Sequence, residues 1–334
     1  MSEAFMGKGR DRTARLPQRI KKQRPFDLSA IREDYPTISI LLAQTVRTLA
    51  ELPDFSDDEK VAVMSDFGGE HKGSRFTTYS FLIMAYDKVG PFEEQTRTLR
   101  EKYNLLDPYS EFSFKDLTYG PRSRALDEFL WIVDHFIHGA VITIAIDRQI
   151  ETVFGPSKKE AHTFLVDQLA AMGLGQWKGP VAEKVLRVCH SIAFFVGLTT
   201  RENQRLLWYC DNDAINEMTK TRNFGDTQKI FQQALAMYAK HSFDLVGFGK
   251  SFDGKSHLDD LLSIPDLAAG VVQDVLKAYA IGDDNIPGGQ EKISLVKWLT
   301  TESQFLSKIT IQISKLENGE IGCGLVDFGP AIRE

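Results

Sequence analysis

Apolar residues recur along the first half of the chain with two different spacings. Alternating or continuous apolar runs are typical of strands, and apolar positions three or four residues apart are typical of amphipathic helices. These patterns predict strands over residues 61–64, 76–85, 111–117 and 141–146, and helices over residues 93–103 and 122–138. The first two strands are expected to form a hairpin with an acidic corner. The succession predicts the opening of a mixed α/β sheet.

The second half continues the alternation of strands and helices. Residues 158–198 are helical in pattern with an interruption at 173–180, and the segment around Pro265 is mostly helical over 258–280. Asn318-Gly319 lies between two apolar runs, 309–314 and 321–328, and this dipeptide is a strong hairpin signal. Further strands are predicted over 205–210 and 243–248, with a helix over 227–241.

The 334 residues suffice for about two domains at roughly 150 residues each, and the number stays open. We expect four parts. These are a basic flexible arm (1–30), an N-terminal helical extension (31–59), a core (60–281) with a helical insertion (157–199), and a C-terminal helix and hairpin extension (290–334).

Charge is distributed unevenly along the chain. Residues 1–25 contain eight Lys or Arg and two acidic residues, a charge of +6, which leaves −12 for the remainder of a chain whose net charge is −6. A basic arm can recruit phosphate backbones by counterion release, and carboxylates on the body can bind cations. A solubilising tail is the alternative interpretation of the arm.

Cysteine content and hydropathy indicate the compartment. Cys189, Cys210 and Cys323 are far apart and form no Cys-x-x-Cys pair, so neither a disulfide framework nor a thiolate zinc site is indicated. No apolar stretch approaches the roughly 20 residues that span a bilayer. We therefore expect a cytoplasmic protein with no membrane contact.

Several aspartates stand where predicted strands end or a helix begins. They are Asp66, the pair Asp211 and Asp213, and Asp266 after Pro265. Proteins with α/β sheets place their chemistry at strand ends. Converging carboxylates from different segments are the ligands that divalent cations such as Mg²⁺ require. Each aspartate alone is typical of a cap or turn, so the inference rests on the set.

Five short segments between residues 61 and 276 form an ordered pattern. They are Ser65-Asp-Phe-Gly-Gly-Glu70, Glu111-Phe-Ser-Phe-Lys115, Ile142-Thr-Ile-Ala-Ile-Asp147-Arg, Leu207-Trp-Tyr-Cys-Asp211 and Leu262-Ser-Ile-Pro-Asp266-Leu-Ala-Ala-Gly. In this order they resemble the bacterial ribonuclease H-like family catalogued as domain of unknown function 3800. Two positions depart from the family pattern, because Phe67 replaces a glutamate and Ser263-Ile-Pro265 replaces Gln-x-Ala.

The resemblance implies a ribonuclease H-like fold, a mixed sheet flanked by helices, and a metal-dependent nuclease. It implies Mg²⁺ or Mn²⁺ ligands at Asp66 on the first strand, Asp211 or Asp213 after a later strand, and Asp266 at a helix start. The fourth ligand stays open between Glu111, Glu70 and Asp147. In such a site one metal activates water and the other stabilises the leaving oxygen.

Three lysines are candidate phosphate contacts. Lys115 lies in the Glu-x-Lys-like segment, where a solvated surface lysine is the alternative, and Lys250 and Lys255 precede the final aspartate. The sequence Gly247-Phe-Gly-Lys-Ser251 lacks the first glycine of a phosphate-binding loop, because Asp244 occupies that position. It is better interpreted as a strand end and turn.

Nucleic acid is the expected partner, with DNA and RNA both open. The alternative function is a non-catalytic scaffold or regulatory subunit that retains the fold, in a mobile-element or phage-defence setting. The departures at Phe67 and at Ser263-Ile-Pro265 favour that alternative. A homo-oligomer or another protein partner also stays open.

Overall fold

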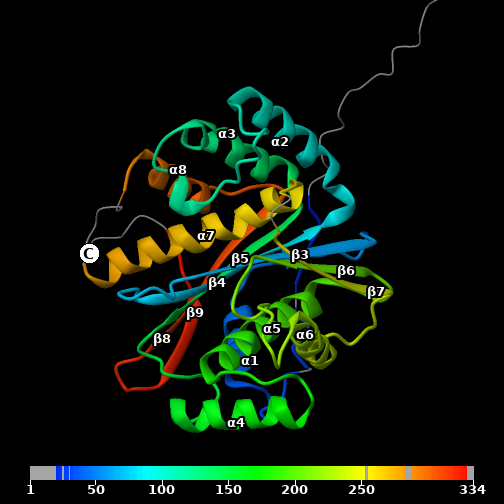
Figure 1. Ribbon diagram of the computed structural model, residues 1–334, viewed down its shortest axis with the longest axis vertical. Helices are drawn as coiled ribbons and strands as arrows, with labels where there is room; N and C mark the ends of the chain where they lie inside the picture. Colours follow the sequence, from blue (N-terminus) through cyan, green and yellow to red (C-terminus); the bar gives the residue numbers. More distant parts are fainter. Residues whose placement is uncertain (1–19, 25, 30, 253–254, 283–287, 329–334) are drawn as a thin grey trace, which may run out of the picture.

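A seven-stranded mixed sheet forms the centre of the protein (Figure 1). The computed structural model describes residues 20–24, 26–29, 31–252, 255–282 and 288–328. The strand order across the sheet is β7-β6-β3-β4-β5-β8-β9. The strands are β3 (Lys60–Gly68), β4 (Phe76–Ala85), β5 (Gly139–Asp147), β6 (Arg205–Cys210), β7 (Leu245–Lys250), β8 (Leu306–Lys315) and β9 (Ile321–Leu325).

Strand direction divides this sheet into blocks. The strands β3, β4 and β5 are successive antiparallel neighbours, whereas β6 and β7 run parallel to β3 on its other side. The hairpin of β8 and β9 extends the opposite edge, with β8 parallel to β5. Its turn places Gly319 at a φ of 86°, a conformation that glycine adopts without strain.

Helices cover both faces of the sheet, and Figure 1 shows the two layers above and below it. One layer contains α1 (Thr37–Val46), α4 (Lys158–Ala171), α5 (Gly179–Thr199) and α6 (Phe224–Tyr238). The other contains α2 (Gly90–Tyr103), α3 (Pro121–Phe136), α7 (His257–Ala280) and α8 (Gln290–Thr300). Short pieces complete the described residues: β1 (Lys22–Gln23) paired with β2 (Leu52–Pro53), and the 3₁₀ turns η1 (Tyr86–Lys88) and η2 (Phe114–Asp116).

The alternation of side chains along β3 assigns each residue to one of the two layers. Val61 and Val63 pack toward α5, while Ala62 and Met64 pack toward α7. A strand projects successive side chains to opposite faces, so Asp66 belongs to the α7 face.

Most of the predicted elements are confirmed. The 61–85 hairpin, the helices over 93–103 and 122–138, and the hairpin at Asn318-Gly319 are present. The strand predicted over 111–117 is wrong. Phe112 stacks on Phe129 of α3 with ring centroids 4.2 Å apart, so the alternating aromatic residues pack on helices and have no sheet partner.

Two parts of the expected division of the chain fall partly or wholly on described residues. The predicted arm lies mostly outside the described residues, but Lys22–Gln23 form β1 against the body of the protein. The region predicted as a helical insertion includes α5, whose residues are largely buried in the main core. Among the described helices, none has the length and apolar character that crossing a membrane requires.

Two buried histidines make the stability of this fold depend on pH. Burial lowers the pKa of His138 and of His190 to about 4, from an ordinary value of 6.5. Between these values the unfolded chain binds protons that the folded chain does not. The contribution of these two histidines to the free energy of unfolding should therefore be greatest above pH 6.5 and should decrease as the pH falls to 4.

Replacing His190 by Gln should remove part of this dependence. The ring of His190 hydrogen-bonds Tyr238 through Nδ1 at 2.7 Å, and Gln can retain a hydrogen bond without titrating. We expect the decrease in unfolding free energy between pH 6.5 and 4 to shrink by about 2 kcal/mol in urea titrations. An identical pH slope in His190→Gln and the wild type would contradict this expectation.

Candidate functional site

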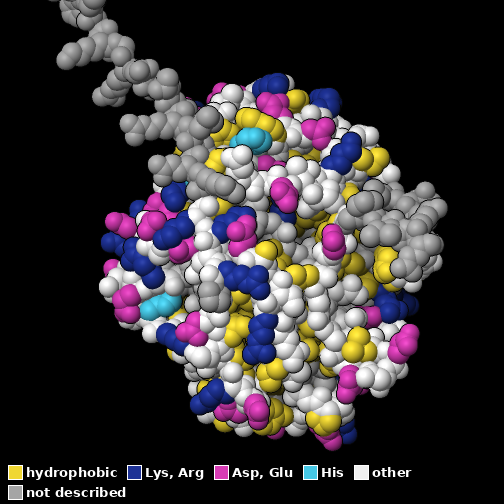
Figure 2. All heavy atoms as spheres, turned by 180° about the vertical axis from the view of Figure 1, so that it is seen from behind, with side chains coloured by type: hydrophobic (Ala, Val, Ile, Leu, Met, Phe, Trp, Pro, Cys, Tyr) yellow, Lys and Arg dark blue, Asp and Glu magenta, His cyan; other side chains and the backbone are white. Residues whose placement is uncertain are grey.

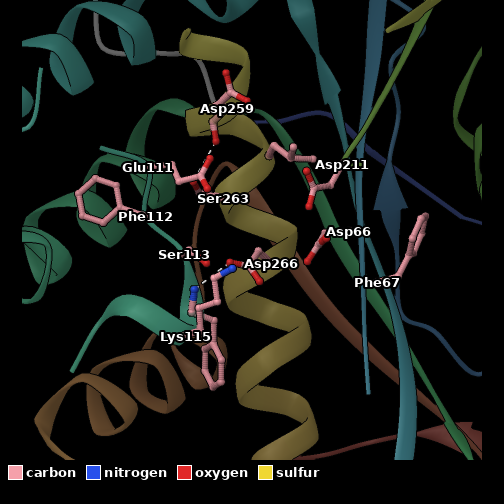
Figure 3. A pocket seen from close by; sticks show the side chains of 12 residues that line it. Asp66, Phe67, Glu111, Phe112, Ser113, Lys115, Asp211, Asp259, Ser263 and Asp266 are labelled. Carbon is pink, nitrogen blue, oxygen red and sulfur yellow. Dashed lines mark hydrogen bonds between the residues drawn. The ribbon is translucent and has the colours of Figure 1, made fainter. Parts of the chain in front are cut away.

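Three aspartates from distant parts of the sequence line one cavity of about 270 Å³ on the α7 side of the sheet. Asp66 comes from β3, Asp211 directly follows β6, and Asp266 lies in α7. Their side chains point toward one another in Figure 3. The remaining lining is supplied by Phe67, Glu111, Phe112, Ser113, Phe114, Lys115, Asp259, Leu262 and Ser263.

Parallel pairing of β3 with β6 brings the first two carboxyl groups together. Ser65 and Cys210 are register partners, and the Asp211 N–H donates to the Ser65 carbonyl at 3.1 Å. Because both aspartates follow these partners directly, they extend from the same end of the sheet. Alternation along β3 directs Asp66 toward α7, and Asp211, which follows the end of β6, lines the same cavity.

Close packing of α7 on the sheet brings in the third carboxyl group. The helix begins at His257 with a capping box formed by Ser256 and Asp259, and it continues through Pro265. Asp266 therefore lies nine residues inside the helix, and its expected place at a helix start is wrong.

The segment before η2 holds the Asp266 carboxylate in place. The Phe114 N–H donates to Asp266 Oδ2 at 2.8 Å. The ring of Phe114 lies on Gly270, where a Cβ atom would come within 2.3 Å of it. Glycine at this position therefore permits the approach that supplies the hydrogen bond.

Burial and like charge act together on these carboxyl groups. Burial raises the pKa of Asp66 well above its ordinary range, and the charges of Asp266 and Asp211 raise it further. Burial also raises the pKa of Asp266 and of Asp211, although the Phe114 N–H opposes this for Asp266. Burial and the neighbouring charge of Asp266 therefore favour the protonated form of Asp66.

The donor set suits a hard divalent cation. In the part of the chain that the structure describes, Asp66, Asp211 and Asp266 form no ion pair, so these oxygens are not committed to a basic side chain. Within the same residues, no group of three or more His, Cys, Asp or Glu is arranged to hold a metal ion. Mg²⁺ retains several waters and binds through one or two carboxylates, a requirement that Asp66 and Asp266 meet.

A chain of charged groups forms the rim beside Asp211. Lys255 Nζ lies 2.9 Å from Glu111 Oε2 and 3.6 Å from Asp259 Oδ1. Glu111 is thus the only one of the three open candidates for a fourth ligand that lines the cavity. Sequence analysis did not select Asp259, although the Ser-x-x-Asp spacing of residues 256–259 marks it as a capping residue.

The other predicted site residues lie elsewhere. Asp213 and Glu70 both form ion pairs with Lys184 of α5, and Asp147 forms one with Arg75 at 2.6 Å. These carboxylates are neutralised outside the cavity, so the choice between Asp211 and Asp213 falls on Asp211. Among the three candidate phosphate contacts, Lys115 lines the cavity and Lys255 lies at its rim. Lys250 ends β7 without lining it.

No protein-family model matches this chain, and a search of curated proteins also finds no match. The function of the chain is therefore inferred from its own residues and their geometry.

The repulsion between the buried carboxyl groups of Asp66, Asp211 and Asp266 should lower the free energy of unfolding of the protein. We expect Asp66→Asn to raise the free energy of unfolding by about 1–3 kcal/mol without divalent cations, because the amide is neutral and removes the repulsion from Asp266 and Asp211. Guanidinium unfolding with EDTA present measures this change. A destabilised Asp66→Asn variant would contradict the assignment of these aspartates to a functional site.

Asp260 in the same helix provides a matched control. Its carboxylate is buried and, unlike that of Asp66, pairs with the buried Arg100 guanidinium and accepts a hydrogen bond from Tyr109. Removing one partner of a buried ion pair is strongly destabilising. We expect Asp260→Asn to lower the free energy of unfolding by about 3 kcal/mol, opposite in sign to Asp66→Asn.

Proposed function

We propose that this chain is a divalent-metal-dependent nuclease with a ribonuclease H-like fold. The observation that carries the proposal is the convergence of Asp66, Asp211 and Asp266 on one cavity without a cationic partner among the described residues. Like-charged carboxylates are costly to hold together, and a bound cation removes that cost. Structural aspartates in this chain, such as Asp260, are instead paired with a base.

The topology of the sheet supports the fold assignment. Strands β3, β4 and β5 are an antiparallel series, and β6 and β7 add in parallel beside β3, so that the first strand of the core is central. This arrangement is the one expected of a ribonuclease H-like sheet. The carboxylates then come from the first strand, the end of the fourth and the helix after the fifth.

Mg²⁺ or Mn²⁺ would be held by Asp66 and Asp266 together with waters, with Asp211 beside them, and would supply activation of water and neutralisation of charge on a phosphodiester. The chain itself would orient the substrate. Lys115 lines the cavity and forms no ion pair among the described residues, so its amino group is free to meet a phosphate oxygen. Lys255, tethered by Glu111, offers a second positive charge at the rim.

In this proposal, residues beside the cavity bind the substrate. On the face shown in Figure 2, acidic and basic side chains of the described residues are interspersed, without an extended patch of one sign. A broad basic surface on that face is therefore not the means of binding. The cations beside the cavity are better placed to position a phosphate, and both DNA and RNA carry the group they would contact.

One observation favours the alternative, a scaffold or regulatory subunit that retains the fold. The described residues include no ready-made group of three metal ligands. In that case the aspartates would be dispensable for function, and divalent cations would leave the melting temperature unchanged. Metal-dependent cleavage that requires the aspartates separates the two functions.

The nuclease proposal is tested by cleavage of labelled single- and double-stranded DNA and RNA with Mg²⁺, Mn²⁺ or EDTA. We expect metal-dependent cleavage that Asp66→Ala and Asp266→Ala each reduce by more than about 100-fold, because each removes a cavity carboxylate. Circular dichroism verifies that the variants are folded.

Asp213→Asn is the matched control for this assay. Asp213 is an aspartate from the same loop as Asp211 but pairs with Lys184 outside the cavity. We expect it to retain activity within about tenfold of the wild type, since a supporting ion pair affects a metal site less than a ligand does. A folded wild type that neither cleaves any substrate nor gains thermal stability with metal would overturn the proposal.

A further inference from the structure

Ser251, directly after β7, is fixed to the end of β6 that precedes Asp211. The buried Ser251 donates its N–H to the Cys210 carbonyl at 3.0 Å and its hydroxyl to Asp259 Oδ1 at 3.0 Å. The side-chain amide of Asn212 donates to the Ser251 carbonyl at 2.9 Å. Three hydrogen bonds therefore hold Ser251 against the rim of the cavity.

The next residue, Phe252, presents an aromatic ring to solvent. Its relative exposure is 56%, and no aromatic ring in the described part of the chain contacts it. Lys255 donates a hydrogen bond to the hydroxyl of Ser251 at 3.0 Å. Phe252 follows one anchored residue and shortly precedes the other, which places it at the cavity rim.

An isolated exposed phenylalanine is common on protein surfaces and needs no explanation. Phe252 differs in its place in the chain, because it directly follows Ser251, whose hydroxyl donates to the cavity residue Asp259 and accepts from Lys255. Glu111 and Asp259, which flank Lys255, lie at one end of the cavity in Figure 3, and Lys115 lies at the other, with the three aspartates between them. A phosphodiester chain crossing the cavity from Lys115 would leave it beside Lys255 and Phe252.

We infer that Phe252 stacks on a nucleobase and that the site takes single-stranded nucleic acid. Proteins that bind single strands combine aromatic rings, which stack on the bases, with basic side chains, which contact the phosphates. Inside a duplex both faces of each base are covered by its neighbours, so a base within the strand can stack on Phe252 only where it is unstacked, as in a single strand. This inference rests on the proposed function, since it extends the same cavity to its substrate.

Binding of fluorescent oligonucleotides to the full chain tests the inference separately from catalysis. The probes are a single-stranded thymidine oligomer of about 12 nucleotides, its abasic counterpart and a blunt duplex, all measured by anisotropy in EDTA. We expect Phe252→Ala to weaken binding of the thymidine oligomer about tenfold and Phe252→Trp to preserve it. Binding of the abasic oligomer should be equal in Phe252→Ala and the wild type.

Tyr279→Ala is the matched control, because Tyr279 is an 83% exposed aromatic residue on α7, about 20 Å along the helix from Asp266. It should bind every probe as the wild type does. Equal affinity of Phe252→Ala and the wild type for the thymidine oligomer would overturn the inference, as would an equal loss on the abasic probe. A chain that binds as expected but cleaves nothing would refute the nuclease and leave the stacking intact.

Discussion

The contact between the Asp66 and Asp266 carboxyl groups is the constraint on which the site depends. The packing of α7 on β3 and β4 holds these two acids together. Burial raises the pKa of both, and their proximity raises that of Asp66 further, so their ionisation is disfavoured. The chain sustains this unfavourable arrangement with apolar contacts such as those of Leu267 and Val271. Stability is thus given up locally where chemistry is proposed.

The alternation of side chains along β3 determines which residue lies next to Asp266. Asp66 faces α7, whereas its neighbour Phe67 faces the other layer, where its ring lies 5.1 Å from Lys184 Nζ. A shift of one residue in the pairing of β3 would exchange the two and place a phenyl ring among the carboxylates. The long pairing of β3 with β4 on one side and β6 on the other makes such a shift costly.

Local patterns predicted most strands and helices, because apolar spacing records which face of an element is buried. They also identified Asp66, Asp211 and Asp266, since strand ends and short motifs are readable locally. Asp213 could not be separated from Asp211, because alternation applies only while the strand continues and β6 ends at Cys210. The alternation of Phe112 and Phe114 imitated a strand, and only tertiary packing reveals that their partners are helices and Gly270.

The ion pairs of Lys184 restrict which segments of this chain can be replaced by segments of another protein. From α5, on the far side of the sheet, Lys184 pairs with Glu70 in the turn after β3 and with Asp213 in the loop after β6. Glu70 follows β3, which carries Asp66, and Asp213 lies two residues after Asp211, so α5 supports the end of the sheet at which the cavity aspartates lie. A chimaera with α5 from another protein would need a basic residue at the position of Lys184 to pair with Glu70 and Asp213. The helix and these two loops would therefore have to be exchanged together.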